Sequence, residues 1–168
     1  MRPLLVVCGS DDGDTQLSAY ALQTAEAVGR LIAQMGAGLV CGGRGGVMRA
    51  ACKGAKDVGG LTIGILPENK EEANEYVEIA LPTGLGKRRN FLVVSAGEAV
   101  IAIGGRCGTL SEIAFAMIFQ KPLILLAGTG GVVDQIVQGR LLQDQHGSYH
   151  VAHSAEEAVN LAWSLVHP

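Results

Sequence analysis

A short apolar run that ends in clustered glycines is the strongest constraint on the fold of this chain. Ala99 to Ile103 holds only apolar residues, which is typical of a strand buried on both faces of a parallel sheet. The glycines within residues 104–108 interrupt the run, and Thr109 with Glu112 three residues later has the spacing of a capping box at a helix start. The stretch therefore predicts a strand, a glycine loop and a helix in succession.

The same pattern occurs a second time in the chain. Residues 42–46 read Gly-Gly-Arg-Gly-Gly after the apolar residues 39–41, so Gly-Gly-Arg-x-Gly stands twice between a predicted strand and a predicted helix. Backbone N–H groups in such a loop, together with the positive end of the helix dipole, bind phosphate well. Glycines can also serve only to turn the chain, but a structural turn has no use for Arg44 and Arg106. We therefore expect an anion site built from both loops.

The composition is that of a folded domain. The chain has 168 residues, enough for one domain with a sizeable core, and 48% of them are apolar while only 17% are charged. The 24 glycines are too many for a helical bundle. The net charge of −3 and the aromatic content of 4% argue against general nucleic-acid binding. Any positive electrostatic potential must therefore be confined to a local part of the protein surface.

Apolar runs and helical patterns alternate along the chain, and no linker divides it. Strands are predicted at residues 4–8, 38–41, 61–66, 99–103 and 122–126, with weaker strands at 76–81 and 148–151. This order predicts a single-domain, doubly wound Rossmann-like α/β fold over residues 1–168, with a mainly parallel sheet and helices on both faces. Ligands of such folds bind outside the carboxyl ends of the strands, where Gly9-Ser10 and both glycine-arginine loops are expected.

Several helical segments carry further expectations. Asp14 or Thr15 is placed to cap the first helix. Residues 85–96 read as one helix with cations in its first turns, which oppose the helix dipole; they form either a solvated face or part of a ligand site. Residues 113–119 are almost wholly apolar, which predicts a buried helix, often at a subunit interface. The glycines within residues 128–131 have no nearby cation and are expected only to turn the chain.

Other motifs narrow the function by their absence. The four cysteines show no metal-site spacing, and no stretch resembles a signal peptide or a membrane span, so we expect a cytoplasmic protein with free thiols and no metal. Cys107 alone lies inside a glycine loop, and a role as a soft ligand stays open. The chain has no Walker motif, no G-x-G-x-x-G after its first strand and no G-x-S-x-G elbow, so nucleotide hydrolysis, ordinary dinucleotide binding and elbow-type hydrolysis are unsupported.

Two adjacent stretches carry a resemblance to a known superfamily. Residues 42–51, followed by residues 59–67 (GGLTIGILP), resemble the Rossmann-like group that includes the Lonely Guy-type cytokinin-activating phosphoribohydrolases and the molybdenum cofactor carrier proteins. The resemblance extends from about Val7 to about Gln120. The group has also been named after lysine decarboxylase, but no lysine lies beside the loops after the central strand to hold pyridoxal phosphate. The resemblance implies a phosphorylated small-molecule ligand and a homodimer or homotetramer.

The motifs differ between the branches of this superfamily. The phosphoribohydrolases carry an Arg-Lys pair and a Pro-Gly-Gly-x-Gly-Thr-x-x-Glu motif, so the resemblance matches Arg89 and Glu112 to their functional arginine and glutamate. This chain has Asn90 in place of the lysine, Gly104 in place of the proline and Arg106 in place of a loop glycine. The Arg-Asn pair and the Ile-Gly-Gly opening look closer to the cofactor carriers. The loop arginines depart from both branches.

Two functions follow, of which we favour the first. A carrier would hold the terminal phosphate of its cargo, by resemblance the molybdenum cofactor, among the loop amides without breaking a bond. An enzyme would hydrolyse the N-glycosidic bond of nucleoside 5′-monophosphates, with Glu112 orienting the ribose or stabilising oxocarbenium charge and Arg89 positioning the substrate. Glu112 could instead only cap its own helix. The candidate ligand-binding residues are Gly9, Ser10, Gly42, Gly43, Arg44, Gly45, Gly46, Arg89, Asn90, Gly104, Gly105, Arg106, Cys107, Gly108 and Thr109, and the candidate catalytic residues are Arg89 and Glu112.

Overall fold

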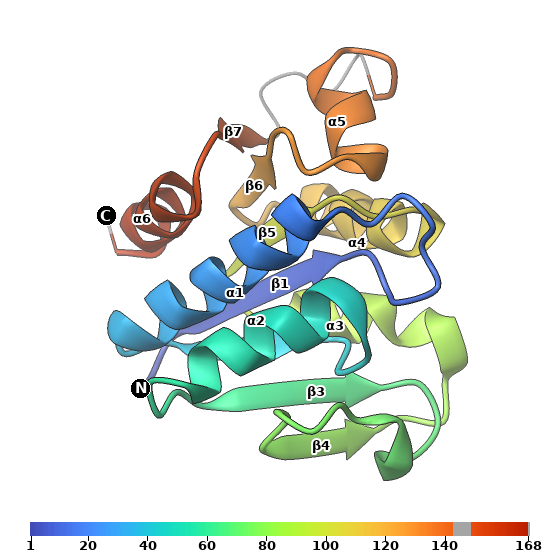
Figure 1. Cartoon of the computed structure of the whole chain (residues 1–168), viewed down its shortest axis with the longest axis vertical. Helices are drawn as coiled ribbons and strands as arrows, with labels where there is room; N and C mark the ends of the chain where they lie inside the picture. Colours follow the sequence, from blue (N-terminus) through green and yellow to red (C-terminus); the bar gives the residue numbers. More distant parts are fainter. Residues whose placement is uncertain (143–148, 168) are drawn as a thin grey trace.

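Parallel strands form the centre of the molecule. The computed structural model describes residues 1–142 and 149–167. Its strands are β1 (Leu4–Gly9), β2 (Gly38–Cys41), β3 (Thr62–Leu66), β4 (Ile79–Pro82), β5 (Ala99–Ile103), β6 (Leu123–Leu126) and β7 (His150–Ala152). In these described residues the seven strands form one parallel sheet in the order β4-β3-β2-β1-β5-β6-β7 (Figure 1). The predicted α/β class is confirmed, and of the strand predicted at 148–151 only Ser148 lies outside the described residues.

The register brings the ends of the central strands to one edge of the sheet. Strand β1 pairs with β2 on one side, Leu5 opposite Leu39, and with β5 on the other, where Gly9 lies opposite Ile103. All residues of β2 and β5 are buried, because helices cover both faces of the sheet. The loops that follow β1, β2 and β5 therefore leave the sheet side by side at its carboxyl edge.

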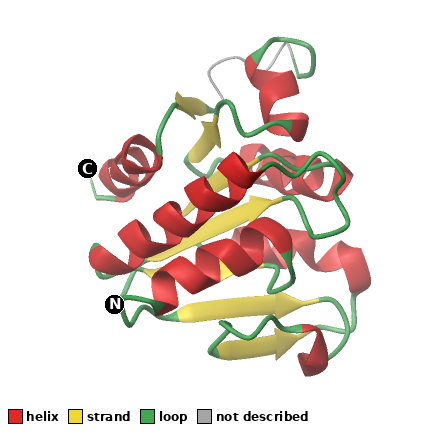
Figure 2. Ribbon diagram, viewed as in Figure 1, coloured by secondary structure: helices red, strands yellow, loops and turns green. Residues whose placement is uncertain are grey.

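Helices cover the two faces in two groups (Figure 2). On one face lie α1 (Ala19–Gln34), α2 (Gly46–Lys56) and α6 (Ala155–Val166), and on the other lie α3 (Asn90–Ala96), α4 (Cys107–Ile118) and α5 (Gly131–Val137). Along β1 the side chains of Leu5 and Val7 join the first core, and those of Val6 and Cys8 join the second. The continuous apolar strands of the sequence thus follow from burial on both faces. None of the helices in the described residues is long and apolar enough to cross a membrane.

Two predicted helix caps are wrong. Helix α1 is capped by Ser18, whose Oγ accepts a hydrogen bond of 3.0 Å from the Ala21 amide, because Asp14 lies in a preceding turn. Helix α4 begins directly after Arg106, which has no side-chain cap bond. Thr109 is therefore the third residue of α4 rather than its cap, and Glu112 is not part of a capping box.

Two predicted helices differ from the observed elements. A single helix was expected at residues 85–96, but the structure has a 3-10 turn, η2 (Gly86–Arg89), followed by α3. Gly86 has a φ of +57°, which is outside the helical range.

The expected burial of residues 113–119 holds only on one side of α4. Ile113 is fully buried, but Ile118 is 68% and Phe119 is 39% exposed, because α4 packs on the sheet along one face only.

Candidate functional site

A cavity lies at the carboxyl edge of the sheet, where the loops after the central strands meet. Its volume is about 570 Å³, within the range of roughly 300–1,000 Å³ that is usual for small-molecule sites. Residues from both glycine-arginine loops line it, so the two loops share one edge as the sequence predicted. The lining residues are Gly9, Ser10, Asp11, Asp12, Gly13, Asp14, Arg44, Gly45, Met48, Pro67, Glu72, Lys87, Arg89, Asn90, Arg106, Gly108, Thr109 and Glu112.

The loop before α4, which we call loop B (residues 104–108), leaves the start of its helix open. In the described part of the chain, the amide N–H groups of Cys107, Gly108 and Thr109 have no hydrogen-bond partner. Gly108 and Thr109 line the cavity, whereas Cys107 does not. Unpaired amides at a helix start, reinforced by the helix dipole, favour an anion.

Neighbouring loops hold loop B in place. The amide of Gly105 donates to Ser10 Oγ at 2.7 Å, and the amide of Gly104 donates to Thr129 Oγ1 at 2.9 Å. The carbonyl of Gly105 accepts from the Val132 amide at 2.8 Å. These two loop glycines therefore shape the site and do not offer their amides to a ligand. The third glycine loop, expected only to turn the chain, also braces loop B.

The loop before α2, which we call loop A (residues 42–46), is already bonded to the chain itself. The amide of Gly46 donates to Asp12 Oδ1 at 2.8 Å, and the amide of Val47 donates to the carbonyl of Ser10 at 2.8 Å. The amide of Gly43 donates to Cys41 Sγ at 3.3 Å. The first two amides of α2 are therefore occupied while those of α4 are not, although the amides of Arg44, Gly45 and Met48 also have no hydrogen-bond partner in the described residues.

The two loop arginines face carboxylates of the segment between β1 and α1. Arg44 forms an ion pair of 3.3 Å with Asp11, and Arg106 Nε lies 4.0 Å from Asp14 Oδ1. The Arg106 side chain is 63% exposed, but that of Asp14 is only 2% exposed. Within the described residues, Asp14 Oδ2 is the buried side-chain oxygen that has no hydrogen-bond partner.

Arg89 is buried, and each of its three guanidinium nitrogens donates a hydrogen bond to the protein. Its Nε donates to the carbonyl of Ile65 at 2.7 Å, its Nη2 donates to the carbonyl of Gly42 at 3.2 Å, and its Nη1 donates to Asn90 Oδ1. Asn90 Nδ2 in turn donates to Ser111 Oγ at 2.8 Å. The Arg-Asn pair thus ties the ends of β2 and β3 to α3 and α4. Burial lowers the pKa of Arg89, which the charge of Glu112 partly offsets.

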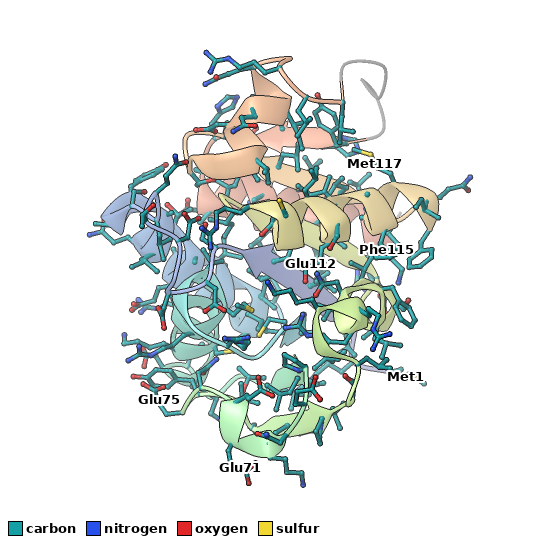
Figure 3. All side chains as sticks on the ribbon, turned by 90° about the vertical axis from the view of Figure 1, so that its right-hand side faces the viewer. Met1, Glu71, Glu75, Glu112, Phe115 and Met117 are labelled. Carbon is teal, nitrogen blue, oxygen red and sulfur yellow. The ribbon has the colours of Figure 1, made fainter. Side chains whose placement is uncertain are left out.

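Glu112 is a buried carboxyl group at the base of the cavity. Burial raises its pKa to about 7, against the opposing effects of the Arg89 charge and a hydrogen bond with Cys8. The Cys8 thiol is also buried, and burial together with Glu112 raises its pKa. Figure 3 shows Glu112 below α4 toward the middle of the molecule, whereas Glu71 lies at the periphery. At neutral pH, Glu112 can therefore both give and accept a proton.

Ten of the sixteen predicted site residues line the cavity, whereas its acidic residues were not among the predictions. The candidates that line the cavity are Gly9, Ser10, Arg44, Gly45, Arg89, Asn90, Arg106, Gly108, Thr109 and Glu112, while Gly42, Gly43, Gly46, Gly104, Gly105 and Cys107 are not among its lining residues. The missed residues include Asp11, Asp12 and Asp14, whose Asp-Asp-Gly-Asp run directly follows the first strand at the binding edge. In the residues the structure covers, no group of three or more acidic, cysteine or histidine side chains is placed to hold a metal ion.

Comparison with known proteins places this site in context. The fold matches the molybdenum cofactor binding protein from the phototrophic bacterium Rippkaea orientalis with a TM-score of 0.86 and 39% identity, over 99% of this chain and 98% of the other. It matches the molybdenum cofactor carrier protein of Chlamydomonas reinhardtii with a TM-score of 0.84 and 33% identity, over 100% of both chains. The cytokinin riboside 5′-monophosphate phosphoribohydrolase of Rhodococcoides fascians is 32% identical over 137 residues, which are 74% of this chain and 67% of that protein. The resemblance found in the glycine loops is thereby confirmed, and because the family profile matches residues 3–159, the chain belongs to the SLOG cluster4 family.

Proposed function

We propose that this protein binds and carries a phosphorylated small molecule, with the molybdenum cofactor as its cargo. The observation that carries the proposal is the start of α4, where three successive amides have no partner among the described residues and two of the three residues line the cavity. The high similarity to two proteins described as binding or carrying molybdenum cofactor supports the identity of the cargo. Cytoplasmic location and a homo-oligomeric state remain part of the proposal.

Cations at the cavity suit an anionic cargo. Arg106 is mostly exposed and only loosely paired, so its guanidinium can turn toward a phosphate at the start of α4. Lys87 also lines the cavity. Each charge-assisted hydrogen bond to the phosphate would contribute about 1.5–3 kcal/mol.

The contacts of Arg89 and Asn90 favour a carrier over an enzyme. The guanidinium of Arg89 already donates to two backbone carbonyls and to Asn90, so it shapes the cavity wall. Asn90 cannot supply the charge of the lysine found in the phosphoribohydrolases. A carrier requires only that the phosphate be held, which the free amides of α4 accomplish without either side chain.

The test removes one of these amides without removing the helix. Cys107 is the first residue of α4, where proline is well accepted, and the preceding Arg106 is extended, as a residue before proline must be. Cys107→Pro is expected to weaken molybdopterin binding by about 10- to 100-fold, the loss of one hydrogen bond to a charged group. The measurement is titration of the purified chain with molybdopterin by fluorescence.

Cys107→Ala is the matched control, because it removes the thiol and keeps the amide. An equal loss in both variants would show that the thiol, not the amide, holds the cargo. Full binding by Cys107→Pro, or no binding by the wild type, would contradict the proposal.

A second function is favoured by Glu112. A buried carboxyl whose pKa is raised to about 7 is suited to acid–base chemistry at neutral pH, and it faces the cavity beside Arg89. The phosphoribohydrolase of Rhodococcoides fascians is a relative of this chain. The second candidate is therefore hydrolysis of the N-glycosidic bond of nucleoside 5′-monophosphates, with the phosphate at α4 and Glu112 at the ribose.

Incubation with nucleoside 5′-monophosphates separates the two functions. Release of free base and ribose 5-phosphate that disappears in Glu112→Gln would favour the enzyme. Molybdopterin binding without any such release, in wild type and Glu112→Gln alike, would favour the carrier.

A further inference from the structure

We propose that Asp12 is a built-in anion that closes loop A, so that the cavity accepts a ligand with one terminal phosphate group and offers no second cradle to a diphosphate or dinucleotide. The inference rests on the proposed function, because it takes the ligand phosphate to bind at the start of α4. It adds the chemical class of the ligand and the residue that determines it.

The carboxylate of Asp12 lies where an anion would bind at the start of α2. Its Oδ1 accepts from the Gly46 amide at 2.8 Å, the first amide of the helix. A Cβ atom on Gly45 would lie 1.9 Å from Asp12 Oδ2, so the carboxylate rests directly on the loop backbone. The amide of Val47 is bonded to the carbonyl of Ser10. Two of the first three helical amides are thus already bonded within the chain.

The charge of loop A is neutralised as well. Arg44 pairs with Asp11 at 3.3 Å, and its carbonyl accepts from Asn74 Nδ2 at 2.8 Å, which fixes the loop from its outer side. A phosphate at this position would meet two carboxylates and displace one of them. Carboxylates of the chain thus already occupy loop A, although the amides of Arg44, Gly45 and Met48 have no hydrogen-bond partner within the described residues.

Loop B differs at each of these points. No carboxylate of the described residues accepts from the first three amides of α4. Asp14, the acidic residue nearest to Arg106, points one oxygen toward the arginine at 4.0 Å, and its other oxygen is buried without a partner. Because a buried acceptor without a donor is unfavourable, this oxygen indicates that a ligand or the shifted Arg106 supplies a hydrogen bond there. The site at loop B is the incomplete one.

The ligand class follows from this asymmetry. A phosphate monoester gains the open amides of α4 and Arg106. A second phosphate would find two of the first three amides of α2 already bonded, and Asp12 repels it. The cavity is therefore expected to favour phosphate monoesters that carry an N–H or O–H donor for Asp14.

Tungstate, a tetrahedral dianion located by its anomalous X-ray scattering, tests the proposal in crystals of the full chain. The wild type is expected to bind one tungstate at residues 107–109 and none at residues 45–47. Asp12→Ala is expected to bind a second tungstate at residues 45–47. Asp57→Asn, which changes the net charge equally but lies at the far end of α2, is the matched control and is expected to bind one.

The outcomes separate this inference from the proposed function. A tungstate at residues 45–47 in the wild type, or none there in a folded Asp12→Ala, overturns the role of Asp12 and leaves the function standing. No tungstate at residues 107–109 in the wild type contradicts the proposed function itself. The wild-type crystals decide the first point even where Asp12→Ala fails to fold.

Discussion

Loops A and B share the pattern Gly-Gly-Arg-x-Gly, but they meet different partners at the start of the helix that follows. In loop A the amide of Gly46 is bonded to Asp12, whereas the amides of residues 107–109 in loop B have no partner in the part of the chain that the structure describes. The arginine of loop A is held in an ion pair of 3.3 Å, whereas that of loop B lies 4.0 Å from its nearest carboxylate. A repeated motif therefore provides one helix start that the chain itself largely occupies and one that it leaves open.

The strand order explains this difference. Strand β1 lies between β2 and β5, so the segment that leaves β1 passes between both loops. Ser10 contacts each of them, with its carbonyl bonded to the Val47 amide and its Oγ to the Gly105 amide. The next two residues, Asp11 and Asp12, then bond to loop A. One segment thus closes one loop and leaves the other to a ligand.

The largest expected difference concerns a Cβ atom placed at one glycine of positive φ in each loop. Gly46 has a φ of +58°, and a Cβ there would lie 2.2 Å from the carbonyl oxygen of Ser10. Gly104 has a φ of +60°, but its nearest contacts are at 3.0 Å. We expect Gly46→Ala to lower the free energy of unfolding by about 4 kcal/mol and Gly104→Ala by about 2 kcal/mol, because both bear the left-handed strain and only the first overlaps backbone severely. Urea denaturation measures both, and a larger loss in Gly104→Ala would reverse the comparison.

Glu112, on the helix after loop B, predicts that the stability of the protein depends on pH. Its pKa is raised by burial from 4.5 to about 7 in the folded chain. Between these two pH values the Glu112 carboxyl loses its proton in the unfolded chain and keeps it in the folded chain. The free energy of unfolding of the wild type therefore falls as pH rises, and it levels off above pH 7. Glu112→Gln lacks this dependence. Its stability relative to the wild type is expected to rise by about 3 kcal/mol from pH 4.5 to pH 8.

Urea denaturation at several pH values measures this effect. Glu71→Gln is the matched control, because Glu71 is an exposed carboxylate at the periphery of the molecule. Parallel stability curves for the wild type and Glu112→Gln would show that Glu112 is not held in a desolvated site.

The fold could be predicted from the sequence because burial on both faces produces apolar runs, and these runs define the strands. The location of the site followed for the same reason, since glycine loops after parallel strands must meet at one edge. The partner of each loop could not be predicted. Asp12 and Gly46 are 34 residues apart, and only the packing of β1 between β2 and β5 brings them together.

The misplaced cap has a related cause. Thr109 and Glu112 have the spacing of a capping box, but α4 starts at Cys107 because Gly104 and Gly105, both with positive φ, complete the turn earlier. Local spacing predicted a closed helix start where the structure has an open one. The open start is the feature on which the proposed function depends.

The smallest expected effect compares Asp12 with Arg106 as contributors to stability. Asp12 caps α2, and removing a side chain at such a position costs about 1 kcal/mol, so Asp12→Ala should unfold at lower urea concentration. Arg106 makes only a loose and exposed ion pair, so Arg106→Ala should change the free energy of unfolding by less than about 0.5 kcal/mol. Added salt should shrink the loss in Asp12→Ala, because part of it is the attraction between the carboxylate and the helix dipole. If Arg106→Ala is destabilised as much as Asp12→Ala, loop B is held by the chain as firmly as loop A without its ligand, and the distinction between an occupied helix start and an open one is wrong.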